Sequence, residues 1–273
     1  MKKLFAYDLD GTLFTHANNM HESTYPALLE VQKNGHYNAV CTGRALNNII
    51  NALGEKINAF SHIIGSNGTV IYNVANKNVT LLGKVDPKVF EYLFTIAKKH
   101  DFSIRIDTVF ESKTYLNSTQ KPKWLDVQNV MDITSWNIVS EDELKKFVET
   151  NKGKIVQIAL RGFKEEIFDA FNKVNIEIGK NYCVKYTNEV YLDINALNIN
   201  KFTGLSYVAN ELGIQSANVY SFGDSGNDID MLIGAGVGVA MGNATQEAKN
   251  AADIIIKSNQ ENSISEFLLK NIK

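Results

Sequence analysis

At 273 residues, with 44% hydrophobic and 21% charged residues, the chain has the length of one large or two smaller globular domains and is too apolar to be largely disordered. Its 28 basic and 30 acidic residues give a formal net charge of −2, which excludes a general attraction to nucleic acid or to an anionic membrane surface. We expect a cytoplasmic protein, because the 2 cysteines form no disulfide framework, acidic residues interrupt any N-terminal signal peptide, and no apolar stretch reaches the roughly 18 residues of a membrane span.

The first part of the chain predicts strands and helices in alternation. Short apolar strands are expected at 4–9, 37–41 and 61–64, and helices at 23–33 and 46–53. Ser23 stands at the expected N-cap of the first helix. Strands that alternate with helices over short connections are typical of a parallel sheet covered by helices on both faces.

The middle of the chain breaks this alternation. A hairpin is expected at 70–82, a helix from Asp86-Pro87 to about residue 99, strands at 102–106, 154–160 and 182–186, and a helix at 164–174, with no assignable pattern at 107–150. After Tyr191 the first alternation returns. We therefore expect an α/β protein whose Rossmann-like parallel-sheet core comprises residues 1–82 and 190–273, with an α+β domain at 83–189 inserted into it.

Two carboxylates follow the first predicted strand, in the segment Asp8-Leu9-Asp10-Gly11-Thr12. Alternate residues of an extended chain share a face, so Asp8 and Asp10 are expected at one site while Leu9 turns into the core. Ligands of open parallel sheets bind beyond the carboxyl ends of the strands, and oxygen ligands suit Mg²⁺. A plain Asp-Gly turn is the alternative, but this pattern arises by chance in only roughly a few chains per thousand of this length.

A second acidic segment, Gly223-Asp224-Ser225-Gly226-Asn227-Asp228, follows another apolar strand. Asp224 and Asp228 can complete an oxygen-rich cation site, because Mg²⁺ combines one or two carboxylates with water and substrate oxygens. Taken alone, the segment is an Asx turn that caps the next helix. The acid pair at the first strand end favours the cation site.

Three weaker signals accompany the acids. Thr42-Gly43 follows a strand and opens a helix, where a hydroxyl, a glycine N–H and the positive helix end can bind an anion, although such a pair alone is more often only an N-cap. Lys201 stands at a predicted helix start, where a cation is unfavourable unless an anion accompanies it. Ser66-Asn67-Gly68 is expected as a turn at the same edge of the sheet.

In this order, the motifs at 8–12, 42–44, Lys201 and 223–228 resemble those of the haloacid dehalogenase superfamily of phosphohydrolases. With Ser66-Asn67-Gly68 after the third strand and a large insert beyond it, the chain is similar to the Cof-type branch with a type IIB cap. The resemblance covers the whole chain, and the first and fourth motifs are highly specific. The insert carries no motif that matches, so the resemblance does not extend to the identity of the substrate.

The resemblance implies a Mg²⁺-dependent phosphatase of small phosphorylated metabolites, such as sugar phosphates. Asp8 would be the nucleophile that forms an aspartyl-phosphate, and Asp10 would act as general acid and then as general base. Mg²⁺ would be bound by Asp8, the backbone carbonyl of Asp10 and Asp224, with Asp228 in the outer shell or bridged through water. The phosphoryl oxygens would be held by the Leu9 N–H, Thr42, Gly43, Lys201 and Asn227.

Other functions remain open at this point. A phosphomutase uses the same scaffold but passes its phosphate to a second substrate. A signalling receiver also forms an aspartyl-phosphate, but places it after a middle strand and has no insert. A sensor without turnover would have no use for the general acid Asp10. For the enzyme, we expect the insert to be a lid that selects the substrate, with hinges near 83–86 and 188–191.

Overall fold

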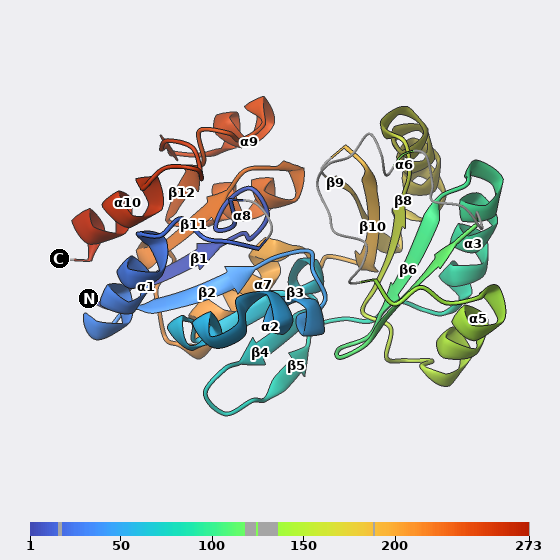
Figure 1. Cartoon of the computed structure of the whole chain (residues 1–273), viewed down its shortest axis with the longest axis horizontal. Coiled ribbons are helices and arrows are strands. Elements are labelled where there is room, and N and C mark those ends of the chain that lie inside the picture. The colour runs from blue at the N-terminus through green and yellow to red at the C-terminus, as the bar shows by residue number, and fades with distance from the viewer. Residues whose placement is uncertain (16–17, 118–123, 125–135, 188, 273) are drawn as a thin grey trace. The chain divides into compact units, whose positions relative to one another are not determined.

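The computed structural model describes residues 1–15, 18–117, 124, 136–187 and 189–272. The chain forms two compact units (Figure 1). The first comprises Met1–Leu82 and Ile199–Lys273, and the second is Gly83–Asn198. The first is a mixed α/β unit and the second an α+β unit, which confirms the expected fold class of a parallel-sheet core with an inserted α+β domain.

The first unit is built on an eight-stranded sheet with the order β13-β12-β11-β1-β2-β3-β4-β5. Its strands are β1 (Leu4–Tyr7), β2 (Tyr37–Cys41), β3 (His62–Gly65), β4 (Val70–Asn73), β5 (Val79–Leu81), β11 (Val219–Gly223), β12 (Val237–Ala240) and β13 (Ile254–Ile255). All neighbours from β13 to β3 pair in parallel, while β4 and β5 add an antiparallel hairpin at one edge. Parallel pairing places the carboxyl ends of these strands along one edge of the sheet.

Helices cover both faces of this sheet. They are α1 (Thr24–Lys33), α2 (Leu46–Leu53), α7 (Lys201–Glu211), α8 (Ile229–Gly234), α9 (Gln246–Ala251) and α10 (Ser263–Asn271). Leu4 and Ala6 of β1 belong to the apolar core beneath α7, whereas Tyr7 faces the other way and stacks on Phe222 at 4.9 Å between ring centroids. The Phe222 ring meets Phe267 of α10 at 5.3 Å, and α10 lies beside α1 (Figure 1). Strand alternation thus supplies one core to each face.

In the described part of the second unit, three helices pack on one face of an antiparallel sheet with the order β7-β6-β8-β10-β9. Its elements are α3 (Lys88–His100), β6 (Ser103–Asp107), β7 (Ser112–Leu116), α5 (Glu141–Thr150), β8 (Gln157–Arg161), α6 (Lys164–Ile178), β9 (Tyr182–Thr187) and β10 (Tyr191–Ala196). Alternate strand residues such as Ile104, Ile106, Leu192 and Ile194 are fully buried against the helices, which gives this unit an apolar core of its own.

Two local features differ in detail from what the sequence predicts. The inserted unit ends at Asn198 instead of residue 189, because β10 pairs with β8 and β9 and places Leu192 and Ile194 in the insert's core. Ser23 is the N-cap residue of α1, as expected, but its side chain does not cap the helix, since its hydroxyl bonds to His21 Nδ1 and to Ser265 Oγ of α10, both at 2.8 Å. The end of the inserted unit depends on strands far away in the sequence, whereas Ser23 has one near partner and one distant partner.

The segment that gave no pattern, 107–150, contains β7 and α5, and its residues 118–123 and 125–135 lie outside the described part of the chain. The α5 helix begins at Ser140 with a capping box, in which Ser140 Oγ accepts from the Glu143 N–H and the Glu143 carboxylate accepts from the Ser140 N–H. Among the residues described, no helix combines the length and the apolar character needed to cross a membrane.

Candidate active site

The residues singled out by the sequence gather at the carboxyl edge of the first unit's sheet. Tyr7 pairs with Phe222 of β11, so Asp8 after β1 and Asp224 after β11 leave the sheet side by side. Thr42 follows the neighbouring strand β2 and is 2% exposed. The parallel register therefore brings segments more than 200 residues apart to one place, as the sequence predicts.

Lys201 joins two of the acids. Its Nζ donates to Asp8 Oδ1 and to Asp228 Oδ1, both at 2.6 Å, and its side chain is fully buried. A capping box at Asn200 sets this position, because the Asn200 side chain accepts from the Thr203 N–H while Thr203 Oγ1 accepts from the Asn200 N–H. The cation at the start of α7 is thus paired with carboxylates, which explains why it is tolerated there.

The loop after β11 orients the other two acids differently. Asp228 Oδ2 accepts from the backbone N–H groups of Asp224 and Ser225 at 2.9 and 3.0 Å, so both of its oxygens are already bonded. Asp224 Oδ1 accepts from the Thr12 hydroxyl at 2.9 Å. The Asp224 carboxylate lies against Gly11, where a Cβ would come within 2.5 Å of Oδ2 and where φ is +84°. The positive φ favours glycine at this position, and a larger residue would also displace the Asp224 carboxylate.

Asp8, Asp224 and Asp228 form a compact acidic cluster. One carboxylate oxygen from each lies within 4.8 Å of the others. Burial raises the pKa of Asp8 to about 7, against the opposing effect of Lys201. Burial also raises the pKa of Asp224 well above its ordinary value, and the charges of Asp8 and Asp228 add to this rise. Three carboxylates share one ammonium group here, an excess of negative charge that a bound cation would balance.

Lys201 stays protonated in this setting. Its burial alone would lower the pKa, but the carboxylates of Asp228 and Asp8 outweigh that effect and hold the pKa above its ordinary value. The cysteine next to Thr42 is inert, because burial raises the pKa of the Cys41 thiol and keeps it protonated.

The carboxylate of Asp10 has a different hydrogen-bond partner from the carboxylates of the acidic cluster. Arg44 Nε donates to Asp10 Oδ2 at 2.8 Å, and Arg44 Nη2 donates to Asp10 Oδ1 at 2.5 Å. The Asp10 side chain is 31% exposed, whereas that of Asp8 is 6% exposed. The two acids of the first motif therefore have different partners and different solvent access.

A strained turn supports the loops that carry Thr42, Gly43 and Asn227. Ser66, Asn67 and Gly68 all have positive φ, at +48°, +52° and +100°. The Asn67 N–H donates to the Thr42 carbonyl at 3.0 Å, and Asn67 Oδ1 accepts from the Asn227 side chain at 3.0 Å. A Cβ on Gly43 would meet Asn67 Oδ1 at 3.0 Å. Backbone strain of this kind persists where the surrounding structure demands it, often at functional sites.

Comparison with known proteins supports an identification. Residues 5–268 match the model of the haloacid dehalogenase-like hydrolases. The chain belongs to the haloacid dehalogenase-like hydrolases. It is 30% identical over 268 residues to the 5-amino-6-(5-phospho-D-ribitylamino)uracil phosphatase YcsE of Bacillus subtilis (strain 168), covering 97% of this chain and 94% of the relative.

A second relative is the 5-amino-6-(5-phospho-D-ribitylamino)uracil phosphatase YitU of the same organism, 23% identical over 272 residues, covering 97% of this chain and 96% of the relative. The fold matches that of the haloacid dehalogenase subclass IIB sugar phosphatase BT4131 with a TM-score of 0.80 and 23% identity over the full length of both chains. The expected membership in the Cof-type branch, and the expected class of phosphoric monoester hydrolase, are confirmed.

Within this hydrolase, sequence reasoning missed two supporting residues. The sequence marks Arg44 only as the end of the motif at 42–44, and Asn67 only as part of a turn. Their side chains bond to Asp10 and to Asn227, which lie 34 and 160 residues away. The sequence indicates Arg44 and Asn67 only through their positions just after β2 and β3, at the carboxyl edge of the sheet. Leu9 is fully buried as expected, and its carbonyl accepts from the Phe14 N–H at 2.7 Å.

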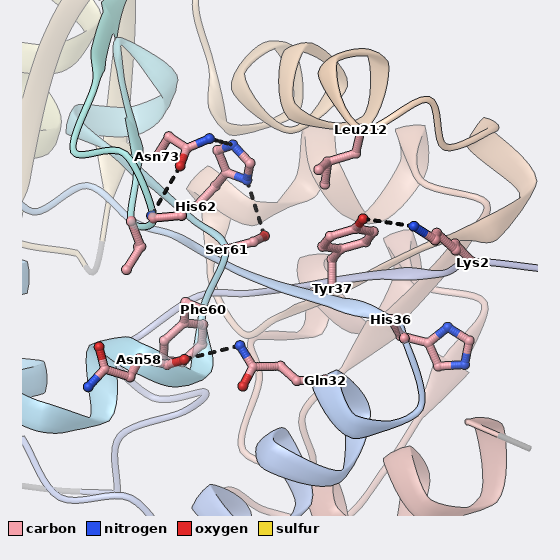
Figure 2. Close-up of a pocket in the computed structure, with 13 residues that line it drawn as sticks. Lys2, Gln32, His36, Tyr37, Asn58, Phe60, Ser61, His62, Asn73 and Leu212 are labelled. Carbon is pink, nitrogen blue, oxygen red and sulfur yellow. Dashed lines mark hydrogen bonds between the residues drawn. The ribbon is translucent and has the colours of Figure 1, made fainter.

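The hydrolase also has a hollow of about 720 Å³ at the opposite, amino edge of β1 to β3 (Figure 2). Its polar groups bond mainly to one another, as Lys2 Nζ does to the Tyr37 hydroxyl at 3.1 Å and Gln32 Nε2 does to the Asn58 carbonyl at 3.0 Å. None of the acids or loop residues described above lines it. The hollow is therefore separate from the acids and loops at the carboxyl edge.

Proposed function

We propose that the chain is a Mg²⁺-dependent phosphatase that hydrolyses small phosphorylated metabolites through an aspartyl-phosphate at Asp8. The observation that carries this proposal is the buried Lys201, which bonds to Asp8 and Asp228 while Asp224 completes the acidic cluster. Phosphoryl transfer depends mainly on positioning and on charge neutralisation, and this cluster is suited to supply both.

The donor set fits Mg²⁺. Three hard oxygen ligands lie at one point. Burial beside like charges raises the pKa of Asp8 and Asp224, so charging them in the folded protein costs free energy that a bound divalent cation would offset. Asp8, Asp224 and the backbone carbonyl of Asp10 would hold the ion. Asp228 would act through water, because Lys201 and two N–H groups already bond its oxygens. The ion would supply charge neutralisation for the phosphoryl oxygens.

The chain's own residues would then divide the reaction into two steps. An oxygen of Asp8 attacks phosphorus, the bond from phosphorus to the leaving oxygen breaks, and Asp10 gives that oxygen a proton. In the second step water attacks the aspartyl-phosphate, Asp10 takes a proton from the water, and Asp8 is restored as phosphate leaves. The Leu9 N–H, Thr42, Gly43, Lys201 and Asn227 would hold the phosphoryl oxygens throughout.

The substrate class is a phosphate ester on a sugar or sugar-alcohol chain. Two relatives carry the name of a phosphatase of 5-amino-6-(5-phospho-D-ribitylamino)uracil, and the fold is shared with a sugar phosphatase. We include that phosphoribityl compound and hexose and pentose phosphates as the first substrates to test. The role of the inserted unit in choosing among them stays a prediction.

The test measures phosphate released from this panel, with Mg²⁺ and after its removal by a chelator. We expect turnover only with Mg²⁺, and loss of turnover to background in Asp8→Asn. A matched control is Asp142→Asn, which removes an exposed acid from α5 and should leave turnover unchanged. Near-normal hydrolysis by Asp8→Asn would contradict the covalent mechanism.

A second measurement examines the intermediate. Asp10→Asn should still form the aspartyl-phosphate from p-nitrophenyl phosphate, whose leaving group needs little protonation, but should hydrolyse it slowly. The phosphate should then be found by mass spectrometry on the peptide that contains Asp8. Equal loss of both steps for every leaving group would show that Asp10 is not the acid and base. Phosphate that passes to a second sugar phosphate instead of water would indicate a phosphomutase.

A further inference from the structure

Two cations pair with three of the four acids of the site, while the fourth, Asp224, accepts from the Thr12 hydroxyl. Lys201 bonds to Asp8 and Asp228, whereas Arg44 bonds to Asp10 through both of its carboxylate oxygens. A guanidinium group that donates two parallel hydrogen bonds fixes the plane of a carboxylate as well as its position. Each carboxylate oxygen keeps a second lone pair, so Asp10 can still exchange a proton with another oxygen.

The Arg44 side chain is itself held from two further directions. Its Nη1 donates to Asn18 Oδ1 at 2.8 Å, and its guanidinium carbon lies 5.4 Å from the centre of the Phe14 ring. The side chain is only 14% exposed. Phe14 is buried and forms a bridge with Asp10, so the loop after β1 supplies the carboxylate, the ring and the amide that surround the arginine.

The backbone of Arg44 is equally well anchored. Its N–H donates to Thr42 Oγ1 at 3.3 Å, and its carbonyl accepts from the Ser66 N–H at 2.9 Å. Arg44 therefore links the loop after β1, which carries Asp10, to the loop after β2, which carries Thr42, and to the strained turn at Ser66. Movement of any of these loops would alter where the Asp10 carboxylate points.

We propose that Arg44 is a positioning residue for Asp10, held in place by Asn18 and Phe14. The proposal rests on the function proposed above, in which Asp10 exchanges a proton with the leaving group and then with water. Arg44 keeps its own protons and takes no part in bond making. Its effect is to hold a partly exposed carboxylate in one orientation, which matters because small misplacements of a catalytic group cost large factors in rate.

This role has a kinetic signature that a general structural role lacks. Protonation of the leaving oxygen matters for an alkyl phosphate such as a sugar phosphate and matters little for p-nitrophenyl phosphate. We expect Arg44→Gln to lower kcat for a sugar phosphate and to lower the rate of aspartyl-phosphate formation from p-nitrophenyl phosphate much less. The first loss should exceed the second by roughly 10- to 100-fold, because general acid–base catalysis contributes about 10²–10⁴-fold. KM for the sugar phosphate should change by less than about 3-fold. Arg44→Lys should recover part of the loss, and Asn18→Ala should show a smaller loss of the same pattern.

Two comparisons separate this proposal from its alternatives. Thr42→Val removes a group that we place on the phosphoryl oxygens, so it should lower both rates alike. The double variant Asp10→Asn with Arg44→Gln should be no slower on the sugar phosphate than Asp10→Asn alone, because Arg44 acts through Asp10. Circular dichroism checks that each variant folds. If Arg44→Gln does not fold, Asn18→Ala provides the test.

The outcomes are distinguishable. If Arg44→Gln lowers both rates equally, or if its loss adds in full to that of Asp10→Asn, Arg44 does not act by positioning Asp10 and the proposal is overturned. If the wild type releases no phosphate with Mg²⁺, or if Asp8→Asn retains its activity, the proposed function itself fails. Selective loss on the sugar phosphate, absent in the Asp10→Asn background, would support the role of Arg44.

Discussion

Replacement of Asp8 by Asn should stabilise the metal-free protein while abolishing turnover. Burial raises the pKa of Asp8 from the 3.8 of an unperturbed aspartate to about 7 in the folded state. The Asp8 carboxyl ionises near pH 4 in the unfolded chain and only near pH 7 in the folded protein, so the folded state binds more protons between these two pH values. Stability from this group is therefore lost as pH rises from about 4 to about 7, and the loss is complete above that range.

The size of the effect follows from the shift. At roughly 1.4 kcal/mol for each tenfold change in proton affinity, charging Asp8 in the folded state costs about 4 kcal/mol at pH 8. Asn resembles the protonated side chain and avoids this cost. We therefore expect Asp8→Asn to be more stable than the wild type by a few kcal/mol at pH 8 without metal, and about equally stable at pH 4.

Mg²⁺ should reverse the order of stability. A cation bound to the charged carboxylates stabilises the folded wild type by an amount that grows with its concentration and with pH. Asp8→Asn, which lacks one of the charged ligands, should gain much less. At pH 8 and millimolar Mg²⁺ the difference between the two proteins should therefore shrink or change sign.

The assay is urea unfolding at pH 4, 6 and 8, followed by far-UV circular dichroism, with and without Mg²⁺. Both tryptophans, Trp124 and Trp136, lie in the second unit, so fluorescence follows that unit while circular dichroism follows both. Asp142→Asn is the control and should leave the pH dependence unchanged. A metal-free Asp8→Asn protein that is less stable than the wild type at pH 8, or that gains equally from Mg²⁺, would refute the reasoning.

Two further predictions concern the surroundings of Lys201. Lys201→Met leaves two buried carboxylates without their cation, so it should destabilise the protein by about 3–5 kcal/mol at pH 8. The loss should be smaller at pH 5, where Asp8 takes up a proton. Equal loss of stability at both pH values in urea unfolding would contradict this. Gly68→Ala should be far more destabilising than Gly35→Ala. Both glycines have positive φ, but only at Gly68 would a Cβ lie 2.0 Å from a backbone oxygen, that of Asn200. Similar melting temperatures for the two variants would argue against this reasoning.

The local pattern of the sequence was sufficient to place the acids. Asp8, Asp224 and Thr42 each follow an apolar strand, and parallel strands in one sheet end at one edge. These positions depend on the alternation of strands and helices, which is written in residues close to one another in the chain. The same holds for the hairpin of β4 and β5 and for the start of α3 after Asp86-Pro87.

The limits of the inserted unit were less accessible. Leu192 and Ile194 alternate with polar residues as they would in any half-buried strand, and nothing local assigns them to one sheet or the other. Their place was decided by pairing with β8 and β9, which are themselves assembled only when the unit folds. Ser23 shows a related limit, since its hydroxyl bonds to His21 and to Ser265, which is 242 residues away, and not to the backbone of its own helix.

By itself, the sequence determined the family, the α/β core with its inserted unit and the edge of the sheet at which the acids meet. Only the tertiary structure decided which cation meets which acid: Lys201 bonds to Asp8, 193 residues away, and Arg44 bonds to Asp10 while it also contacts Asn18 and Phe14. A motif gives the residue types, and the local periodicity of the chain predicts the strand ends that carry them. The hydrogen-bond partner of a buried charge depends on which side chains the folded loops bring within about 3 Å, and that distance is a property of the whole fold.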